Sequence, residues 1–176
     1  MRRRTDGAFD ARQRGPDGPL DPSGYVKGWA VERATEMVAQ GGARNFAWNA
    51  GGDVVVRGEA APGVAWRVGV RHPLEHERVA AVLAVTDLAV ASSGAYERGD
   101  HIVDPRTGRP PVGVLAVTVV GPSMTIADCL ATAVFAMGAD GASWLARSEP
   151  GYDGCAITAD GRMRTTPGFE ALRVRE

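Results

Sequence analysis

Two oxygen-bearing side chains, Asp128 and Thr132, lie four residues apart in a segment whose pattern predicts a helix. Residues four apart share one side of a helix, so both side chains face the same way. Carboxylate and hydroxyl oxygens suit a hard cation such as Mg²⁺. Two structural interpretations compete with a metal site. Thr125-x-x-Asp128 resembles a capping box with aspartate in place of glutamate, and the Thr132 hydroxyl can bond back to the Asp128 carbonyl.

Lys27 is the one lysine among 20 basic residues, and all the others are arginine. An ammonium is a compact point charge that does not freely replace a planar guanidinium at a tight anionic site. Lys27 lies in the stretch 21–30, where a glycine-containing loop opens a predicted helix. Helix N-terminal amides together with a lysine can hold phosphate. The spacing matches neither a P-loop nor G-x-G-x-x-G, so the alternative is a solvated lysine at a loop-to-helix turn.

His101 stands in the stretch 100–110, DHIVDPRTGRP, between an aspartate and two turn-forming pairs. An imidazole titrates near neutral pH and can act as a general base. Arg106 and Arg109, a few residues later, could bind a phosphate or a carboxylate. The same histidine also fits an ordinary polar position at the end of a strand, and the residues alone leave both interpretations open.

Three further patterns carry weaker signals. His72 and His76 have the His-x3-His spacing of a zinc site on a helix, but no third ligand is evident, which favours a polar surface loop. The turn 49–53, NAGGD, permits close approach to a ligand or an ordinary glycine hairpin. The stretch 91–94, ASSG, indicates the end of a strand.

The elements that must position these residues indicate an α+β fold, because the expected strands outnumber the helices and do not alternate strictly with them. A loop is expected over 1–23. Helices are predicted over 27–40, with an apolar stripe of Ala30, Ala34, Met37 and Val38, and over 126–137. Glycines 41–42 and 138 end these helices. Strands are predicted over 45–50, 54–58, 66–70, 79–93 (as one or two strands) and 114–121, with a hairpin over 154–168.

The composition fits one globular domain. The chain has 176 residues, 44% of them hydrophobic, which is enough to bury a core and argues against disorder. A net charge of −1 provides no strong attraction to nucleic acid or to a membrane surface. No secretory signal or membrane-spanning run is evident, so a cytoplasmic location is expected. Cys129 and Cys155 make no zinc spacing, in keeping with a reducing compartment.

Five segments occur in the order and character of the FAD:protein FMN transferase family, the ApbE-type flavin transferases. They are GAFD, DPSGYVKGWAVER, NAGGD, SSGAYERGDHIVDPRTG and ADCLAT, and the resemblance covers about 6–138. GYVKGWA and HIVDPRTG are the most specific. The resemblance implies one ApbE-like domain over 1–176, with a mixed, largely antiparallel sheet and flanking helices. It also implies a shortened N-terminus, since only six residues precede Gly7 where the family usually has a longer region. A second, mild departure is SSG in place of the commoner TSG.

The resemblance implies a magnesium-dependent transferase that cleaves FAD and releases AMP. The FMN half is attached through its phosphate to a threonine of an acceptor protein. Two alternatives remain: a pyrophosphatase that converts FAD to FMN and AMP, and a non-enzymatic protein that binds flavin nucleotides. The implied partners are FAD and the acceptor protein, without nucleic acid and without direct membrane insertion.

The resemblance also carries residue roles onto this sequence. His101 corresponds to the catalytic histidine, with Asp104 as the residue that could orient it or share its role. The metal ligands would be the backbone carbonyl of Gly24 and the side chains of Asp128 and Thr132. The residues in contact with FAD would be Ala8, Phe9, Asp10, Asp21, Lys27 and Ile102.

Overall fold

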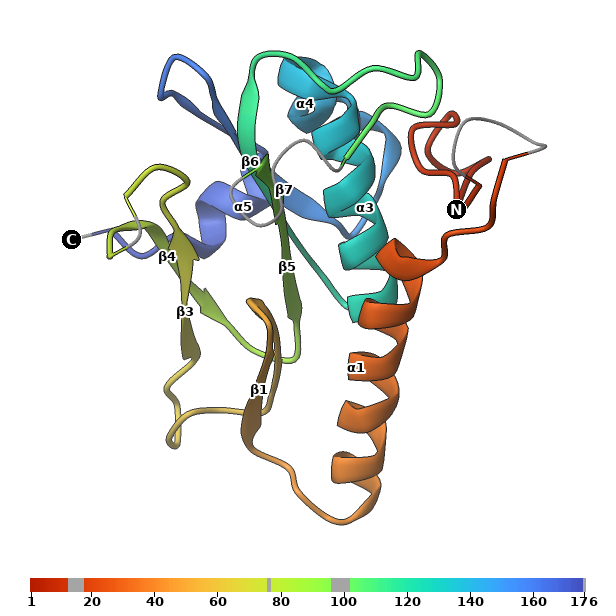
Figure 1. Cartoon of the computed structure of the whole chain (residues 1–176). Coiled ribbons are helices and arrows are strands. Elements are labelled where there is room, and N and C mark those ends of the chain that lie inside the picture. Colours follow the sequence, from red (N-terminus) through yellow and green to blue (C-terminus); the bar gives the residue numbers. More distant parts are fainter. Residues whose placement is uncertain (13–17, 76, 96–101, 176) are drawn as a thin grey trace.

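The computed structural model describes residues 1–12, 18–75, 77–95 and 102–175 (Figure 1). The fold is α+β, as the sequence predicts. Six strands form one sheet in the order β1-β2-β5-β6-β7-β8, and β3 and β4 form a separate pair. All the pairings between these strands are antiparallel. The strands are β1 (Phe46–Ala50), β2 (Asp53–Arg57), β3 (Trp66–Arg71), β4 (Val79–Val85), β5 (Ala89–Gly94), β6 (Val114–Gly121), β7 (Asp153–Thr158) and β8 (Met163–Thr165).

Within the described residues, four helices and one short 3-10 turn accompany the strands. The helices are α1 (Ser23–Gln40), α3 (Met124–Ala136), α4 (Gly141–Ser148) and α5 (Pro167–Leu172), and the turn is η1 (Gly138–Asp140). The expected strands and the C-terminal hairpin β7-β8 are confirmed, and the run 79–93 forms two strands rather than one. The sequence did not predict α4 and α5, because they have only 8 and 6 residues and their apolar patterns are too short to stand out. No described helix has the length and apolar character needed to cross a membrane.

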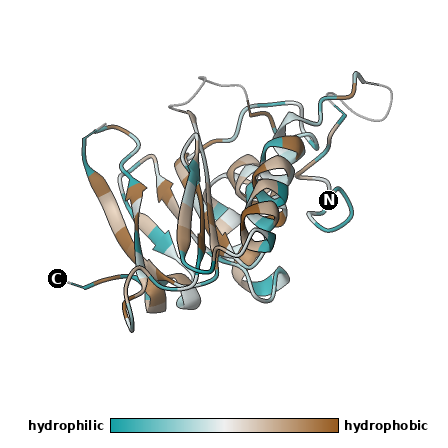
Figure 2. Ribbon diagram, turned by 90° about the horizontal axis from the view of Figure 1, so that it is seen from below, coloured by the Kyte–Doolittle hydropathy of each residue, from teal (hydrophilic) through white to brown (hydrophobic). Residues whose placement is uncertain are grey.

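The molecule has three layers. Helices α1 and α3 lie on one side of the six-stranded sheet, and the β3-β4 pair lies on the other (Figure 1). Figure 2 shows the same layers from below, with much of the hydrophobic character on the strands. Strand β2 serves both faces, because alternate side chains of a strand point in opposite directions. Val55 packs toward α3, whereas Val54 and Val56 pack toward β3 and β4.

Strands β1 and β2 are joined by a tight turn at Gly51 and Gly52. Both glycines have positive φ, 63° and 97°, which a side chain would disfavour. The Asn49 side-chain oxygen accepts a hydrogen bond from the Gly52 amide at 3.0 Å. This turn delivers Asp53, the first residue of β2, into the layer between the sheet and the helices.

Helix α1 packs against α3 in an antiparallel arrangement, with glycines at the contact. A Cβ atom on Gly28 would lie 2.9 Å from Cβ of Asp128 and 2.9 Å from the carbonyl oxygen of Met124. A Cβ atom on Gly24, one turn earlier, would lie 3.8 Å from Oγ1 of Thr132. Gly28 therefore lets the helix backbones approach closely, and Gly28 and Gly24 lie opposite Asp128 and Thr132 of α3, respectively.

The predicted apolar stripe of α1 is wrong in part: Ala34 and Val38 are half-buried, but Ala30 and Met37 are not. The buried residues of this helix are Gly28, Val31 and Thr35, whereas Met37 is 70% exposed and Ala30 is exposed. The helix also begins at Ser23, four residues before the expected start. The error has a physical cause: the packed side is made of small residues, so it leaves little hydrophobic signal in the sequence. The predicted glycine end is confirmed, with Gly42 at φ 96°.

The capping-box interpretation of Thr125-x-x-Asp128 is also wrong. The N-cap of α3 is Ser123, whose side chain accepts a hydrogen bond from the Ile126 amide. The carboxylate of Glu32, from α1, then accepts hydrogen bonds from the Ser123 hydroxyl at 3.0 Å, and from the amide and hydroxyl of Thr125. A neighbouring helix thus provides the carboxylate at the start of α3, which leaves Asp128 without a capping role.

Candidate metal and nucleotide site

Three charged side chains from three different elements meet between the sheet and the helices. The Lys27 ammonium, on the second turn of α1, lies 2.7 Å from Oδ2 of Asp53 and 3.5 Å from Oδ1 of Asp128. The two carboxylates are 1% and 2% exposed, respectively. The Lys27 side chain is 40% exposed, as the alternative of a solvated lysine expects, but its ammonium also forms ion pairs with the two buried acids.

The environment of Asp128 disfavours an ionised carboxylate unless a cation binds to it. Its Oδ2 atom is buried and has no hydrogen-bond partner. Burial raises the pKa of Asp128 to about 6, and the negative charge of Asp53 adds to the rise, while Lys27 partly opposes it. An unpartnered, buried carboxylate oxygen is costly and is a reason to expect a ligand at that atom.

The remaining expected metal ligands lie at the same contact between α1 and α3. Oγ1 of Thr132 lies one helical turn from Asp128 and 3.4 Å from the hydroxyl of Ser93, at the end of β5. The Gly24 carbonyl points toward α3, where it accepts the Cys129 thiol at 3.5 Å. Carboxylate, hydroxyl and carbonyl oxygens are the donors that Mg²⁺ takes, so the residues present fit that ion.

The described residues do not form a site of the kind that binds a softer metal such as Zn²⁺. No three of their His, Cys, Asp or Glu side chains gather in a way that could hold a metal ion. The His72 imidazole accepts hydrogen bonds through Nδ1 from the amides of Leu74 and Glu75, as expected of a polar surface loop. His76 lies outside the described residues, so the zinc alternative rests on the sequence pattern alone.

The N-terminal segment packs beside this site. Ala8 and Phe9 are buried against Cys129 and Ala133 of α3, and the Phe9 ring lies 3.3 Å from where a Cβ atom on Gly24 would be. These two residues therefore have a packing role, whether or not they also touch a nucleotide. Their position brings the GAFD segment to the start of α1, as a shared site requires.

The two acidic residues expected at the nucleotide have partners of their own. Asp10 forms an ion pair with Arg2 at 3.0 Å and accepts the amide of Arg12. Oδ1 of Asp21 accepts the amide of Ser23 at 3.0 Å, immediately before α1. Asp21 thus shapes the loop that opens the helix carrying Lys27.

The stretch around His101 is described only in part. His101 itself lies outside the described residues, and Ile102, which follows it, is partly buried against the core cluster that includes α3 residues. Asp104 is bound by the Arg106 guanidinium through both oxygens, at 2.9 and 3.2 Å from Nε and 2.9 Å from Nη2. Burial acts to raise the pKa of Asp104, but the hydrogen bonds and charge of Arg106 outweigh it and lower the pKa. Arg106 therefore binds a carboxylate within its own loop.

Sequence reasoning missed two contributors to this site. Asp53 was considered only as part of a glycine turn, and Ser93 only as a strand end. Asp53 is buried, its Oδ1 accepts the Ser92 amide at 3.2 Å, and its Oδ2 is an ion-pair partner of Lys27. The available signal was an aspartate directly before the apolar run 54–56, at a position whose alternation places it on the same side as Val55.

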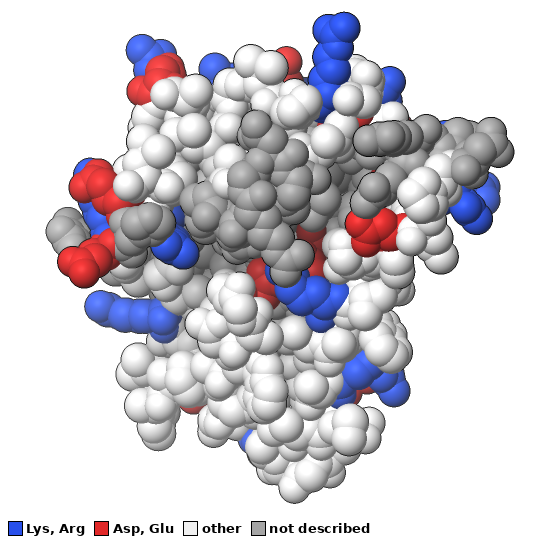
Figure 3. Space-filling model, viewed as in Figure 1, with Lys and Arg blue, Asp and Glu red and all other residues white. Residues whose placement is uncertain are grey.

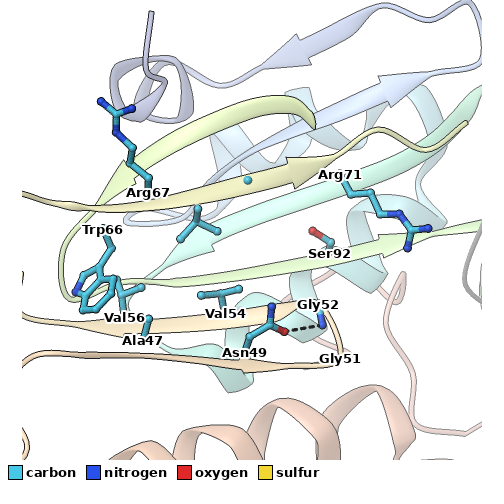
Figure 4. Close-up of a pocket in the computed structure, with 12 residues that line it drawn as sticks. Ala47, Asn49, Gly51, Gly52, Val54, Val56, Trp66, Arg67, Arg71 and Ser92 are labelled. Atoms are coloured by element: carbon cyan, nitrogen blue, oxygen red, sulfur yellow. Dashed lines mark hydrogen bonds between the residues drawn. The ribbon is translucent and has the colours of Figure 1, made fainter. Parts of the chain in front are cut away.

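A separate cavity of about 510 Å³ lies on the other face of the sheet. It is lined by the β1-β2 hairpin, β3 and Ser92 of β5, and the lining includes Val54 and Val56, which point away from Asp128. Figure 4 shows Arg71 and Ser92 toward one end of this cavity, and Trp66 and Arg67 toward the other. The cavity and the Lys27 site therefore lie on opposite sides of the sheet at β2 and β5.

Charged residues on the face seen in Figure 3 form small, separate groups of both signs. This distribution agrees with the net charge of −1. The electrostatic environment of the site is therefore set mainly by its own groups, the Lys27 ammonium and the two buried carboxylates, and not by a charged surface patch on this face.

The site combines a buried carboxylate, a hydroxyl and a lysine between an antiparallel sheet and a glycine-packed pair of helices in an α+β fold, and comparison with known proteins places the chain in a family. The ApbE family profile matches residues 2–156. The chain belongs to the ApbE family.

Similar proteins include flavin transferases from several bacteria. The chain is 34% identical over 168 residues to the FAD:protein FMN transferase of Rhodobacter capsulatus, covering 91% of this chain and 32% of that protein. It is 33% identical to the enzyme of Treponema pallidum, covering 85% and 46%. The chain thus spans about a third to a half of the length of these relatives.

Solved structures agree with the fold. The ApbE protein of Thermotoga maritima superposes with a TM-score of 0.79 at 31% identity, covering 89% of this chain and 54% of that one. The flavin transferase ApbE of Vibrio cholerae superposes with a TM-score of 0.80 at 24% identity, covering 97% and 72%. The resemblance seen in the sequence and the expected fold are both confirmed.

Proposed function

We propose that this chain carries out magnesium-dependent FAD:protein FMN transfer. FAD is cleaved at its diphosphate, FMN is attached through its phosphate to a threonine hydroxyl of an acceptor protein, and AMP is released. The observation that carries the proposal is the buried, unpartnered Oδ2 of Asp128, with the hydroxyl of Thr132 one turn away and the ammonium of Lys27 alongside. Family membership supports the substrate, since the relatives named above are FAD:protein FMN transferases.

Each residue of the site has a distinct task in this reaction. Asp128, Thr132 and the Gly24 carbonyl would hold Mg²⁺, which would supply positive charge to neutralise the diphosphate. Lys27 contributes a positive charge that can bind a phosphate oxygen. Since phosphoryl transfer depends mainly on positioning and charge neutralisation, these contributions account for most of what the protein must supply.

His101 is proposed as the general base. The threonine hydroxyl of the acceptor loses its proton to the imidazole as its oxygen forms a bond to the phosphorus of the FMN half. The bond from that phosphorus to the bridging oxygen breaks, and the bridging oxygen leaves with its electron pair as part of AMP. A positioned base contributes a factor of about 10²–10⁴.

The test of the proposal is incubation with FAD and Mg²⁺, with and without an acceptor protein that carries a threonine among small residues. Transfer gives a flavin-fluorescent acceptor band on a denaturing gel together with AMP. Release of FMN and AMP without an acceptor would instead identify a pyrophosphatase. Bound FAD with neither product would identify a flavin-nucleotide binding protein.

His101→Ala tests the base. We expect a fall in turnover of about 10²–10⁴-fold, with the dissociation constant for FAD little changed, because the imidazole acts on the acceptor hydroxyl. His72→Ala is the matched control, since that imidazole contacts groups of its own surface turn: it accepts hydrogen bonds from the amides of Leu74 and Glu75 and lies 3.7 Å from the Glu75 carboxylate. Equal turnover in the two variants would remove His101 from the role.

A further inference from the structure

The ammonium of Lys27 is shared unequally between two buried carboxylates. It lies 2.7 Å from Oδ2 of Asp53 and 3.5 Å from Oδ1 of Asp128. Asp53 thus holds the closer ion pair, although its Oδ2 makes no hydrogen bond of regular geometry. The closer partner is the one that neither the sequence patterns nor the family resemblance assigns to the site.

Asp53 is itself fixed in place. Its other oxygen, Oδ1, accepts the backbone amide of Ser92 in β5 at 3.2 Å, and its backbone begins β2 immediately after the Gly51-Gly52 turn. The side chain is 1% exposed. A carboxylate anchored by a strand amide is a rigid holder for an ammonium on a flexible four-carbon stem.

The position of this ammonium decides what Asp128 can bind. An ammonium and a divalent cation compete for the same carboxylate, and the competition is strong where burial reduces screening by water. If Lys27 were centred on Asp128, a metal ion would have to displace it. With the ammonium drawn toward Asp53, one oxygen of Asp128, Oδ2, stays without a partner.

We propose that Asp53 is a positioning residue of the metal site: it holds the Lys27 ammonium away from Asp128, so that Asp128 can take a divalent cation while Lys27 stays beside the ion to meet a phosphate. This inference rests on the proposed function for the identity of the site. It assigns Asp53 a role through Lys27, and not as a metal ligand.

The experiment is a double-mutant cycle read by metal binding in the absence of FAD. Mn²⁺ is the probe, and the free ion is measured by electron paramagnetic resonance. The chains are the unaltered protein, Asp53→Asn, Lys27→Met and the double variant. Asparagine keeps an oxygen for the Ser92 amide, so this substitution removes the charge and spares the strand contact.

We expect Asp53→Asn to weaken Mn²⁺ binding by about 10–100-fold in the chain that has Lys27, as is usual when an outer partner of a metal site is lost. In the Lys27→Met chain, Asp53→Asn should weaken Mn²⁺ binding by a several-fold smaller factor, because no ammonium is left to move onto Asp128. An equal loss of Mn²⁺ affinity in both chains would overturn the inference. Asp53 would then act on the metal directly, as a ligand or through the electrostatic attraction of its charge. No cost in either chain would overturn it as well.

Two controls separate this inference from the proposed function. Asp128→Asn should abolish Mn²⁺ binding in every background, and an unaltered chain that fails to bind Mn²⁺ would overturn the metal site and the role of Asp53 together. Loss of Lys27 favours protonation of Asp128, so the cycle is run at about pH 7.5 and again near pH 8.5. Thermal unfolding of each variant shows whether an altered affinity reflects an altered fold.

Discussion

At the scale of single residues, the site combines groups that are unfavourable separately. A buried carboxylate with a free oxygen costs stability, and so does a second carboxylate beside it. Lys27 offsets part of that cost, and the unpaired oxygen of Asp128 remains. Functional sites commonly keep such unfavourable charges because a ligand resolves them.

The pKa of Asp128 gives a prediction about stability. The folded-state pKa is about 6, above the ordinary 3.8, so the fold favours the protonated form. The contribution of this group is therefore fully present below about pH 4 and is lost as pH rises through about 6. Without metal, Asp128→Asn should raise the free energy of unfolding near pH 8 by about 1–3 kcal/mol and change it little near pH 4.

Urea unfolding at the two pH values checks this prediction. Asp140→Asn, at an exposed position before α4, is the control and should change stability by less than about 0.5 kcal/mol. If Asp128→Asn were destabilising near pH 8, the carboxylate would be a net stabilising group, and the argument for a ligand at its Oδ2 atom would fail.

At the scale of elements, the antiparallel contact of α1 and α3 builds the site. Gly24 lies opposite Thr132, Gly28 opposite Asp128, and Glu32 reaches the start of α3. Three successive turns of α1 therefore meet three successive turns of α3. Gly28 sets how close the helices come, and that distance sets where Lys27 meets Asp128.

Gly28→Ala and Gly24→Ala should differ in their effect on stability. A methyl group on Gly28 would meet Cβ of Asp128 and a backbone oxygen at 2.9 Å, neither of which can move easily. We expect a loss of about 1–3 kcal/mol from overpacking. On Gly24 the nearest atom is the Phe9 ring at 3.3 Å, which can shift. Alanine also gains about 0.5–1 kcal/mol of helix propensity, so Gly24→Ala should be near neutral.

Chemical denaturation of the two variants measures this difference. Ser23→Ala, on the exposed first turn of α1, controls for a general change in helix stability. A Gly28→Ala chain as stable as the Gly24→Ala chain would show that the helices are not packed at this separation.

At the scale of the whole molecule, the sheet separates two buried regions that hold one free cysteine each. Cys129 packs with Ala8 and Phe9 beneath the N-terminal segment, and Cys155 packs on the β3-β4 side. Burial raises the pKa of both thiols to about 12. Since the thiolate is the reactive form, neither cysteine should be reactive while the fold is intact.

Thiol labelling in increasing urea tests whether the three layers unfold together. We expect no reaction with a disulfide reagent near pH 8 in the native protein, and both thiols to become reactive across one transition that coincides with loss of circular dichroism. The unfolded chain in concentrated guanidinium, with both thiols reactive, is the control. Early reaction of Cys129 alone would show that the N-terminal segment opens independently.

Much of this protein could be predicted from local sequence. The strands, the glycine turn at Gly51-Gly52 and the buried helix around Asp128 are set by alternation, by positive-φ glycines and by an all-round apolar pattern. These signals lie within a few residues of one another. The candidate metal ligands on α3, Asp128 and Thr132, could be proposed for the same reason, because a spacing of four fixes a shared side of a helix.

Only the tertiary structure shows which residues from other elements surround Asp128 and Thr132 and fix their environment. Glu32 caps α3, Gly28 faces Asp128, and Asp53 holds Lys27, although these pairs are separated by 26 to 100 residues in the chain. The stripe of α1 was mistaken because the packed side of that helix is small rather than apolar. Sequence patterns record the preferences of a segment for water or for a core, whereas the approach of two distant charges depends on how layers pack and on the closeness that each residue allows.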